Sequence, residues 1–597
     1  MSATASSRKW LVAVPFVGLV LIAVALSAFD ADVLYRVQER SLFLNTPLFF
    51  QQCMVSSGGL LSWAGVYLTQ YFMYPVLGAV LLCLCWAVLV VVTLVAFRIP
   101  ARWAAVALVP VVLLLISDVS LGYWIYYLKL RGYYFVATLG AIVVVSLVGC
   151  YRWLSARYVH LSLAFLILTA VCGYPLFGFY GLLALLLMAV SSWRTAKSRR
   201  AAIVTTLIAI PAIAAIPLFC YYLVYHETNM VNIYWTALPV FQMNDKGYPV
   251  FYIPYVLLVL VLVTMALARW PEKAGYKPVL LTVVLVLATC IFWYKDGNFR
   301  RELRMSRALD RQDWEQVIKL SADVNHPTRD ICMMRNLALF RLGRQGSEMY
   351  HYPNGNSPSS SPFPTRLLHI DGKKLYLNYG LLNFCYRWCI EDGVEYGWSV
   401  EGVKMMVKCA LLNGEQEAVR KYISILRKTT FQRKWCEKYE AFLRNPRLMT
   451  NDPELRPILY MLKNDDDYLT SDNADCEQFM INHFASAESQ NPIYQEQSLL
   501  AALQLRNMQV FWLQFYQYTE LHPEQRAPLH YQEAACLFGR LSDEVDTSRM
   551  PFDPQVVKRC DEFLAAMEQH HGQVNESVAS ALYDRFHDTY FYHYFFN

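Results

Sequence analysis

The chain has 597 residues, of which 56% are hydrophobic and 17% are charged, and its formal net charge is +6. This length exceeds what one hydrophobic core supports, so two or more domains are expected. The charged fraction is below the usual quarter of a soluble protein. The basic excess lies in short loops between apolar runs, so it gives no support to nucleic-acid binding, and we expect no nucleic-acid partner.

The composition changes sharply near residue 294. Residues 1–294 carry 18 Lys/Arg and 7 Asp/Glu, whereas residues 295–597 carry 35 and 40. The first part has a membrane composition and the second a soluble one. The sequence therefore predicts an all-α protein with a transmembrane domain over 1–294 and a second helical domain over 295–597.

Nine apolar runs in the first part approach the length that crosses roughly 30 Å of hydrocarbon. They predict a polytopic bundle of about nine transmembrane helices, at residues 10–28, 74–97, 102–117, 133–150, 158–173, 175–192, 201–223, 250–268 and 278–294. The first run also fits a cleaved signal peptide loosely, but its apolar core is longer than such a peptide needs, which favours a retained helix.

Loop charges predict the orientation. With a cytoplasmic N-terminus, 13 Lys/Arg lie in inner loops and 5 in outer loops, which agrees with the positive-inside rule. Nine crossings then place residue 295 onward outside the cell's inner (cytoplasmic) membrane, which is the periplasm if the cell is a Gram-negative bacterium. Three apolar runs begin with Tyr-Pro, at Tyr74-Pro75, Tyr174-Pro175 and Tyr248-Pro249. Proline is tolerated in the first helical turn, so each pair predicts the start of a helix.

Three polar loops, the first over 29–73, the second over 118–132 and the third over 224–249, are predicted to lie outside. The first loop opens with Asp30 and Asp32. Carboxylates of this kind can act as a general base or hold a divalent cation. They can equally be structural, with Asp30 capping a helix and Asp32 pairing with Arg36. Asp118 and Asp245 are further acidic candidates in these loops. The basic candidates for binding a lipid phosphate are Arg36, Arg40, Lys129 and Arg131.

This layout resembles the GT-C class of membrane glycosyltransferases over residues 10–294. The resemblance implies catalytic residues at Asp30 and Asp32, a polyprenyl-phosphate-linked sugar as donor, and phosphate-binding roles for the loop cations. By overall pattern, the whole chain also resembles an uncharacterised family of bacterial polytopic membrane proteins with a C-terminal helical tail, which implies no activity.

The second part shows short amphipathic helices joined by turns, such as Val400 to Leu412, Asn413-Gly414, and Glu415 to Lys428. The pairs resemble tetratricopeptide (TPR-like) repeats, which usually bind protein. A flexible loop is predicted over 350–365 and an exposed connection over 449–475. The aromatic stretch Tyr376 to Trp398 indicates packed core or sugar binding, and the aromatic C-terminus indicates docking on the repeats or on the membrane.

Several common reactions lack their motifs here. The sequence has no P-loop, GxGxxG, HExxH or GxSxG pattern, so nucleotide-driven and nicotinamide chemistry are not expected. The 15 cysteines include no CxxC, and they leave both disulfides and buried thiols open. Three functions remain as hypotheses: a GT-C-like transferase, a non-enzymatic envelope scaffold whose repeats bind a periplasmic or secreted protein, and a transporter. No apolar run has an ionisable residue near its centre, which disfavours the transporter.

Overall fold

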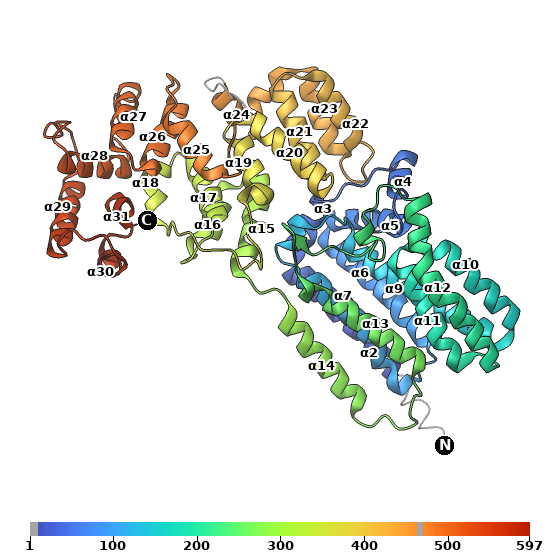
Figure 1. The fold of residues 1–597 in the computed structure, drawn as a ribbon. Helices are drawn as coiled ribbons and strands as arrows, with labels where there is room; N and C mark the ends of the chain where they lie inside the picture. Colours follow the sequence, from blue (N-terminus) through green and yellow to red (C-terminus); the bar gives the residue numbers. More distant parts are fainter. Residues whose placement is uncertain (1–9, 463–469, 524, 597) are drawn as a thin grey trace. The chain divides into compact units, whose positions relative to one another are not determined.

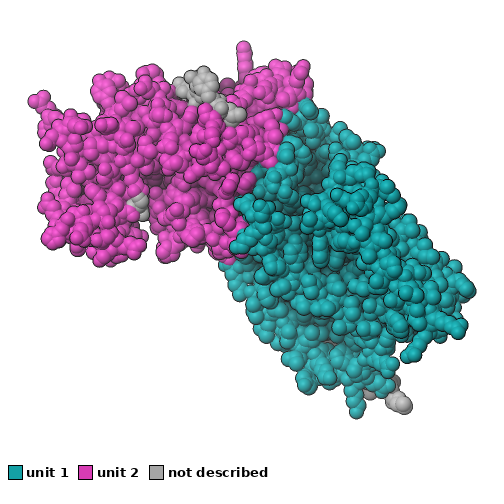
Figure 2. Space-filling model, viewed as in Figure 1, with its two compact units in different colours: residues 1–295, 392–404, 421–437 teal, residues 296–391, 405–420, 438–597 magenta. Residues whose placement is uncertain are grey.

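The computed structural model describes residues 10–462, 470–523 and 525–596. Within these residues, the regular secondary structure is helical apart from one short antiparallel pair of strands, β1 (Gln242–Met243) with β2 (Lys246–Gly247). This confirms the predicted all-α class. The chain forms two compact units, drawn in teal and magenta in Figure 2. Unit 1 comprises Met1–Lys295, Asp392–Lys404 and Lys421–Glu437; unit 2 comprises Asp296–Glu391, Met405–Arg420 and Lys438–Asn597.

Unit 1 contains the apolar helices of the first half (Figure 1). Its elements are α2 (Trp10–Phe29), α3 (Ala31–Glu39), α4 (Pro47–Cys53), α5 (Gly59–Thr69), η1 (Gln70–Met73), α6 (Pro75–Ala96), η2 (Ala101–Ala107), α7 (Leu108–Val119), α8 (Trp124–Tyr127), α9 (Tyr133–Arg157), α10 (Val159–Phe177), α11 (Phe179–Thr195), α12 (Arg199–Leu223), η3 (Met230–Asn232), η4 (Pro249–Tyr252), α13 (Ile253–Leu267) and α14 (Lys277–Phe292).

Helix α9 lies at the centre of unit 1, where it packs against α5, α6, α10 and α11. Its valines Val144, Val145 and Val148 are fully buried. Helices α2 and α14 instead expose apolar side chains; for example, Val20 is 63% exposed and Val279 is 68% exposed. Such a broad apolar surface is unusual for a protein that faces only water.

Among the described residues, seven helices are long and apolar enough to cross a membrane by length and composition. They correspond to seven of the nine predicted runs. The other two runs form α11 and α14, which have 17 and 16 residues. Helix α14 passes the same test only when it is counted together with the following helix. All nine apolar runs are therefore helical, and two of them are shorter than the sequence predicts.

Two of the three Tyr-Pro pairs lie at helix starts as predicted. Pro75 is the first residue of α6, and Pro249 is the first residue of η4, which leads into α13. Pro175 is different, because it lies inside α10 near the C-terminal end of that helix. The break comes at Gly178, where φ is +56° and an added Cβ would approach the carbonyl oxygen of Thr236 to 2.7 Å. The predicted helix start at Pro175 is thus wrong.

Unit 2 is built from shorter helices. Its elements are α15 (Gly297–Asp310), α16 (Trp314–Ala322), α17 (Arg329–Arg341), α18 (Gln345–Glu348), η5 (Met349–His351), the π-helical turn η6 (Leu368–Gly372), α19 (Lys373–Asn378), η7 (Pro446–Asn451), α24 (Leu455–Leu462), α25 (Cys476–Ala485), α26 (Pro492–Leu505), α27 (Met508–Leu521), α28 (Leu529–Leu541), α29 (Pro554–Gln569), α30 (Glu576–Phe586) and α31 (Tyr590–Phe596). Four helices have residues in both units: α20 (Leu382–Tyr396), α21 (Val400–Leu412), α22 (Gln416–Leu426) and α23 (Arg433–Arg444).

Consecutive helices of unit 2 pack against each other, as α15 does with α16, α25 with α26, and α28 with α29 (Figure 1). Short polar side chains fix where many of them begin. Asn491 and Asn507, for example, accept hydrogen bonds from backbone N–H groups in the first turns of α26 and α27. These caps satisfy donors that a helix start leaves unpaired.

Aromatic side chains from both aromatic stretches of the second half lie in the core of unit 2, although Tyr396 and Trp398 belong to unit 1 and Trp398 is 44% exposed. Tyr376 and Phe384 are fully buried. At the C-terminus, Tyr590 packs on Phe538 with ring centroids 5.9 Å apart, and the ring centroid of Phe591 lies 5.9 Å from that of Phe563. Of the two placements left open for the aromatic C-terminus, the structure shows docking on the helices of unit 2.

Candidate functional site

Arg36 lies in α3 and Arg40 follows its last residue, both in the first polar loop, and both are buried. Arg36 pairs with Glu401, and its Nη1 also lies 3.3 Å from Oε2 of Glu39. Arg40 donates from Nη1 to Oδ2 of Asp392 at 3.2 Å. The two arginines therefore bind acidic groups of the segment Asp392–Lys404, which belongs to unit 1 although it lies in the second half of the chain.

Tyr126 of the second polar loop joins the two arginines. The guanidinium carbons of Arg36 and Arg40 lie 5.3 and 5.9 Å from the centre of its ring, within the range of a cation–π interaction. Its carbonyl oxygen accepts a hydrogen bond of 3.0 Å from Nη2 of Arg40. The first and second loops are thereby held together around a shared aromatic ring.

Lys129 and Arg131 contact the same segment. Nζ of Lys129 lies 2.8 Å from Oε1 of Glu395, and both side chains are largely exposed. Nη2 of Arg131 donates to the carbonyl oxygen of Gly397 at 3.3 Å. Burial, followed by the positive charge of Arg40, lowers the pKa of Arg131 to about 9, so this side chain remains a cation at neutral pH.

All four predicted phosphate-binding cations thus lie in one cluster, which we call the arginine cluster: Arg36, Arg40, Lys129 and Arg131. Four carboxylates lie within it, those of Glu39, Asp392, Glu395 and Glu401. The formal charges balance. A buried cation that already has a hydrogen-bonded acid cannot bind a lipid phosphate unless that acid is displaced, and an unpaired buried charge is costly.

A second segment of the later chain is held in unit 1 as well. The backbone N–H of Asn45 donates to the carbonyl oxygen of Lys428 at 3.0 Å. The ring centroid of Phe431 lies 5.6 Å from that of Tyr71 and 5.5 Å from that of Tyr74. These contacts attach Lys421–Glu437 to the end of the first polar loop.

Asp30 and Asp32 occupy the start of α3. Asp30 is the residue before the helix and is buried at 5% exposure, but its side chain makes no capping hydrogen bond. Its Oδ1 accepts a hydrogen bond of 3.2 Å from Nε1 of Trp293. Asp32 lies in the first turn, where a negative charge favours the helix dipole. The structure therefore shows a structural role for each acid at the start of α3. Their catalytic role stays a prediction.

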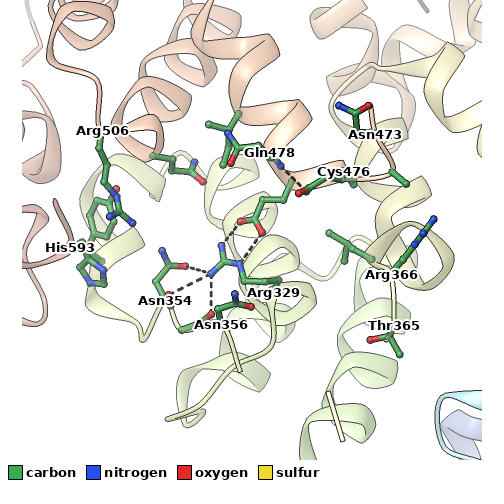
Figure 3. Close-up of a pocket in the computed structure, with 18 of the residues that line it drawn as sticks. Arg329, Asn354, Asn356, Thr365, Arg366, Asn473, Cys476, Gln478, Arg506 and His593 are labelled. Carbon is green, nitrogen blue, oxygen red and sulfur yellow. Dashed lines mark hydrogen bonds and ion pairs between the residues drawn. The ribbon is translucent and has the colours of Figure 1, made fainter. Parts of the chain in front are cut away.

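Unit 2 contains a polar cavity of about 810 Å³ (Figure 3). Its lining comes from α17, the loop after η5, the loop before α25, the end of α26, and α31. Arg329 lies in the middle of the view, and Arg366 and Arg506 lie on opposite sides of it. Side-chain amides are frequent in the lining, which includes Asn354, Asn356, Asn473, Gln478 and Gln504.

Arg329 organises the floor of this cavity. It pairs with Glu477, with 2.8 Å between its Nε and Oε2 of the acid, and donates from Nη1 to the carbonyl oxygen of Gly355 at 3.0 Å. Arg335, fully buried one turn and a half further along α17, donates to the carbonyl oxygen of Pro353 at 2.9 Å. These bonds hold the first part of the predicted loop 350–365 against α17.

The opposite wall is fixed by the buried carboxylate of Asp472. It accepts hydrogen bonds from the Tyr376 hydroxyl at 2.9 Å, from Nε1 of Trp388 at 2.6 Å and from Arg387 at 2.7 Å. The next acid, Asp475, accepts from the backbone N–H of Gln478 and so caps α25. The loop that presents Asn473 is therefore anchored by its neighbours on both sides.

His593 of α31 lines the cavity and is 5% exposed. One ring nitrogen, Nε2, lies 2.9 Å from the carbonyl oxygen of His587. Burial is the main cause that lowers the pKa of His593 from 6.5 to about 3; the hydrogen bond to His587 opposes it, and the charges of His530 and Arg506 act in the same direction as burial. The imidazole is therefore neutral at physiological pH.

This lowered pKa predicts that acid destabilises unit 2. Between pH 6.5 and 3 the unfolded chain binds a proton at this position and the folded chain does not, so stability falls as pH falls, by about 1.4 kcal/mol per unit. Between pH 7 and 5, the wild-type chain should lose about 2 kcal/mol more than His593→Asn. Unfolding curves of both proteins at several pH values measure this difference. Parallel pH profiles would contradict the assignment.

The sequence did not predict this cavity. Part of its polar lining comes from the stretches 350–365 and 449–475, which the sequence predicts to be connections: Asn354, Asn356, Thr365, Asn473 and Asp475. The sequence signal in these stretches is their content of asparagine, as in Asn354-Gly355-Asn356, and of aspartate, as in 449–475. All 15 cysteines are free thiols. Within the described ranges, no group of three or more His, Cys, Asp or Glu side chains is placed to hold a metal ion.

A search of curated proteins and a search of solved structures each found no match. A family model does match, over residues 6–597, and it is described as a family of unknown function, DUF6057. The match covers both units, including the loops of the arginine cluster and the lining of the polar cavity. The chain therefore belongs to the DUF6057 family.

Proposed function

We propose that the protein is a multi-pass membrane scaffold whose C-terminal helices bind a protein partner outside the membrane. In the part of the chain that the structure describes, seven helices meet the length and composition that a membrane requires. The apolar side chains that α2 and α14 expose would contact lipid. In water the same surfaces would drive aggregation.

The helix count supports an exoplasmic C-terminus. Helices α11 and α14 span about 25 Å each at 1.5 Å per residue, a few ångströms less than the hydrocarbon layer, and flanking aromatic residues can extend them into the interface. If both cross, nine helices do; if neither crosses, seven do. Both of these counts are odd and place unit 2 outside when the N-terminus is cytoplasmic. A count of eight, in which only α14 crosses in addition to the seven, would place unit 2 inside, so the proposed placement requires α11 and α14 to behave alike.

A reporter fused after Asn597 checks this topology. We expect alkaline phosphatase, which is active only outside the cytoplasm, to be active in this fusion, and green fluorescent protein exported through the same route to be dark. A second pair of fusions after Arg98, which is predicted to lie inside, should give the opposite result. A cytoplasmic reading at Asn597 would overturn the proposed placement.

The arginine cluster is the observation that favours a scaffold over a transferase. Three of the four cations that a transferase of the GT-C kind would direct at a lipid phosphate are bound to the chain's own acids, namely Arg36, Arg40 and Lys129. Arg36 and Arg40 are buried with their acids, and Arg131 donates to the carbonyl oxygen of Gly397. The cluster therefore supports a structural role, in which the first two polar loops hold the segment Asp392–Lys404. The repeated helix pairs of unit 2, which we interpret as a TPR-like array, then supply the binding surface.

Substitution of the two acids separates these functions. We expect Asp30→Asn and Asp32→Asn, singly and together, to restore the phenotype of a deletion strain as fully as the wild-type gene does. Asparagine at position 30 keeps an oxygen that accepts the hydrogen bond from Trp293. Loss of complementation by a variant with wild-type abundance and melting temperature would support catalysis and contradict the scaffold.

A transferase remains the second candidate because unit 1 has an apolar cavity of about 650 Å³ under the third polar loop. Its lining includes Trp235, Phe241, Tyr248, Val256 and Leu260, which suit a polyprenyl chain. Among the described residues that line it, none is acidic. The cavity therefore accounts for binding of an apolar chain but supplies no general base for sugar transfer.

A further inference from the structure

We propose that residues 427–434 bind the anionic headgroups of membrane phospholipids, through Lys428 and Lys434. These residues, which we call the basic segment, run from the end of α22 to the first turn of α23 and belong to unit 1. The inference rests on the membrane placement in the proposed function. It goes beyond that function because it assigns a lipid partner to a particular surface.

The basic segment has four cations and no acid among its eight residues. Arg427, Lys428, Arg433 and Lys434 are all exposed. Arg433 pairs with Glu437, with 2.9 Å between its Nε and Oε1 of the acid. Among the residues that the structure describes, Lys428 and Lys434 have no acid within ion-pair distance. The positive charges of these two lysines are therefore available to a ligand.

The part of the first polar loop beside the basic segment supplies no acid either. Residues 41–74, which contain the contacts with the segment, include no Asp or Glu. The later chain as a whole is acidic, with 40 Asp/Glu and 35 Lys/Arg over residues 295–597. The basic segment is thus a local positive surface in an acidic part of the chain, and an anion from outside the chain can neutralise it.

Phe431 fixes the position of the basic segment relative to a membrane-length helix. Its ring packs on Tyr71 and Tyr74, and α6, one of the helices long and apolar enough to cross a membrane, begins at the next residue, Pro75. Tyrosine is enriched where membrane helices meet the headgroups. Lys428 and Lys434 each lie three residues from Phe431, so both lysines lie near the level of the headgroups.

The first turns of α6 expose apolar side chains directly beyond Tyr74. Val76, Leu77 and Leu84 are all exposed, and under the proposed function they contact lipid. Phospholipids whose chains cover this surface carry their headgroups at the level of Tyr74. The lipid partner is therefore already beside the basic segment and needs no separate site to bring it there.

Helix α4 marks the same level from another side. The backbone N–H of Asn45 donates to the carbonyl oxygen of Lys428 at 3.0 Å, and α4 begins two residues later, at Pro47. This helix buries none of its residues and exposes Leu48 and Phe50. Exposed apolar side chains on a short helix beside a membrane bundle suit the boundary between headgroups and hydrocarbon.

Charge attraction gives the expected size of the effect. A lysine ammonium binds a phosphate as a point charge, and its long stem allows the charge to reach the headgroups. Each lysine close to an anionic membrane surface strengthens binding by about fivefold. Two such lysines should together favour an anionic lipid over a zwitterionic one by about tenfold or more.

The test measures lipid binding to the purified full chain in detergent by native mass spectrometry. The probes are phosphatidylglycerol, which is anionic, and phosphatidylcholine, which is zwitterionic, with the same acyl chains. We expect phosphatidylglycerol to bind about tenfold or more tightly. The double variant Lys428→Gln with Lys434→Gln should lose this preference and bind phosphatidylcholine like wild type. It keeps the backbone hydrogen bond from Asn45, so its melting temperature should not change.

Hydrogen–deuterium exchange locates the site. The full chain is compared in nanodiscs of phosphatidylcholine with and without phosphatidylglycerol. We expect the backbone amides of residues 427–434 to exchange more slowly when phosphatidylglycerol is present, and the double variant to lose this difference. Exchange of these amides that does not respond to phosphatidylglycerol would overturn the inference.

Lys319→Gln with Lys558→Gln is the matched control. Both lysines are exposed and lie in unit 2, on α16 and α29, so this variant removes the same charge from elsewhere and should keep the wild-type preference. Equal losses in the two double variants would contradict the assignment, because the preference would then follow net charge alone. Competition by inorganic phosphate as strong as that by phosphatidylglycerol would also contradict it, since it would indicate a site for free anions.

This experiment and the topology test fail separately. An active phosphatase fusion at Asn597 without a preference for phosphatidylglycerol would refute the lipid-binding surface and leave the scaffold standing. A cytoplasmic C-terminus with that preference intact would refute the proposed placement of unit 2 and assign the lipid to the inner leaflet.

Discussion

Replacing Arg40 with alanine is expected to destabilise unit 1 by about 3–5 kcal/mol, because it leaves a buried carboxylate without its cation. Arg40 and Asp392 expose only 3% and 7% of their side chains. The substitution also removes the hydrogen bond to the carbonyl oxygen of Tyr126. Denaturant unfolding of the purified chain in detergent, followed by tryptophan fluorescence, measures the loss.

Two further variants make this result specific. Lys129→Ala removes a pair whose side chains are 63% and 57% exposed, so it should cost less than about 1 kcal/mol. The double variant Arg40→Leu with Asp392→Leu removes both buried charges and should recover most of the stability that Arg40→Ala loses. Equal stabilities of Arg40→Ala and Lys129→Ala would contradict the structural role of the arginine cluster.

Gly132→Ala is the second substitution with a large expected effect. Gly132 has φ of +73°, and an added Cβ would lie 2.5 Å from the backbone carbon of Gly65 and from the backbone nitrogen of Val66. The backbone of Gly65 and Val66 is held in α5, and that of Gly132 is held at the start of α9. Neither backbone can move away from the added Cβ without disturbing its helix. We expect a loss of about 3 kcal/mol or more, from backbone strain and overpacking together, measured by the same unfolding assay.

Gly275→Ala separates these two contributions. Gly275 has a similar φ of +55° but no atom within 4 Å of an added Cβ. It should therefore show the strain alone, about 1–2 kcal/mol. If both alanine variants lose the same free energy of unfolding, the close approach of Gly65 and Gly132 contributes nothing to the loss. The packing of α5 on the start of α9 must then differ from the structure.

Hydropathy predicted the helices of unit 1 because membrane length and apolar composition are local properties of the sequence. The error at Pro175 has a non-local cause. The sequence pattern at Tyr174-Pro175 matches that at Tyr74-Pro75, but α10 continues through the proline and ends only where Gly178 meets Thr236. That contact joins residues 58 positions apart, and a local pattern does not contain it.

The residues of the arginine cluster were predictable as charged loop groups, whereas their partners were not. Arg36 and Glu401 are separated by 365 positions, and Arg40 and Asp392 by 352. The sequence alone suggests that Arg36 pairs with Asp32, one turn earlier in the same helix. The fold instead brings a distant acidic segment to the loops, which changes the expected role of the cations from binding a ligand to holding the chain.

The polar cavity was hidden for a related reason. Arg329 begins a helix, Asn354 lies in a loop, and Glu477 lies in a later helix. The local sequence around each of them predicts a solvent-exposed surface residue. They meet because Arg329 bonds to both of the others. Composition predicts that 350–365 and 449–475 are connections, although α24 forms within the second of them. Only the packing of α17 against the first loop and α25 shows that these residues enclose a site.

Binding of a polyprenyl phosphate to the purified full chain bears most directly on the role of the arginine cluster. Native mass spectrometry can compare polyprenyl phosphate with the uncharged polyprenol. Because Arg36, Arg40 and Lys129 are paired with Glu401, Asp392 and Glu395, we expect the phosphate to give no increase in bound lipid over the polyprenol. Saturable, phosphate-dependent binding that Lys129→Gln weakens at an unchanged melting temperature would contradict the scaffold and restore the transferase.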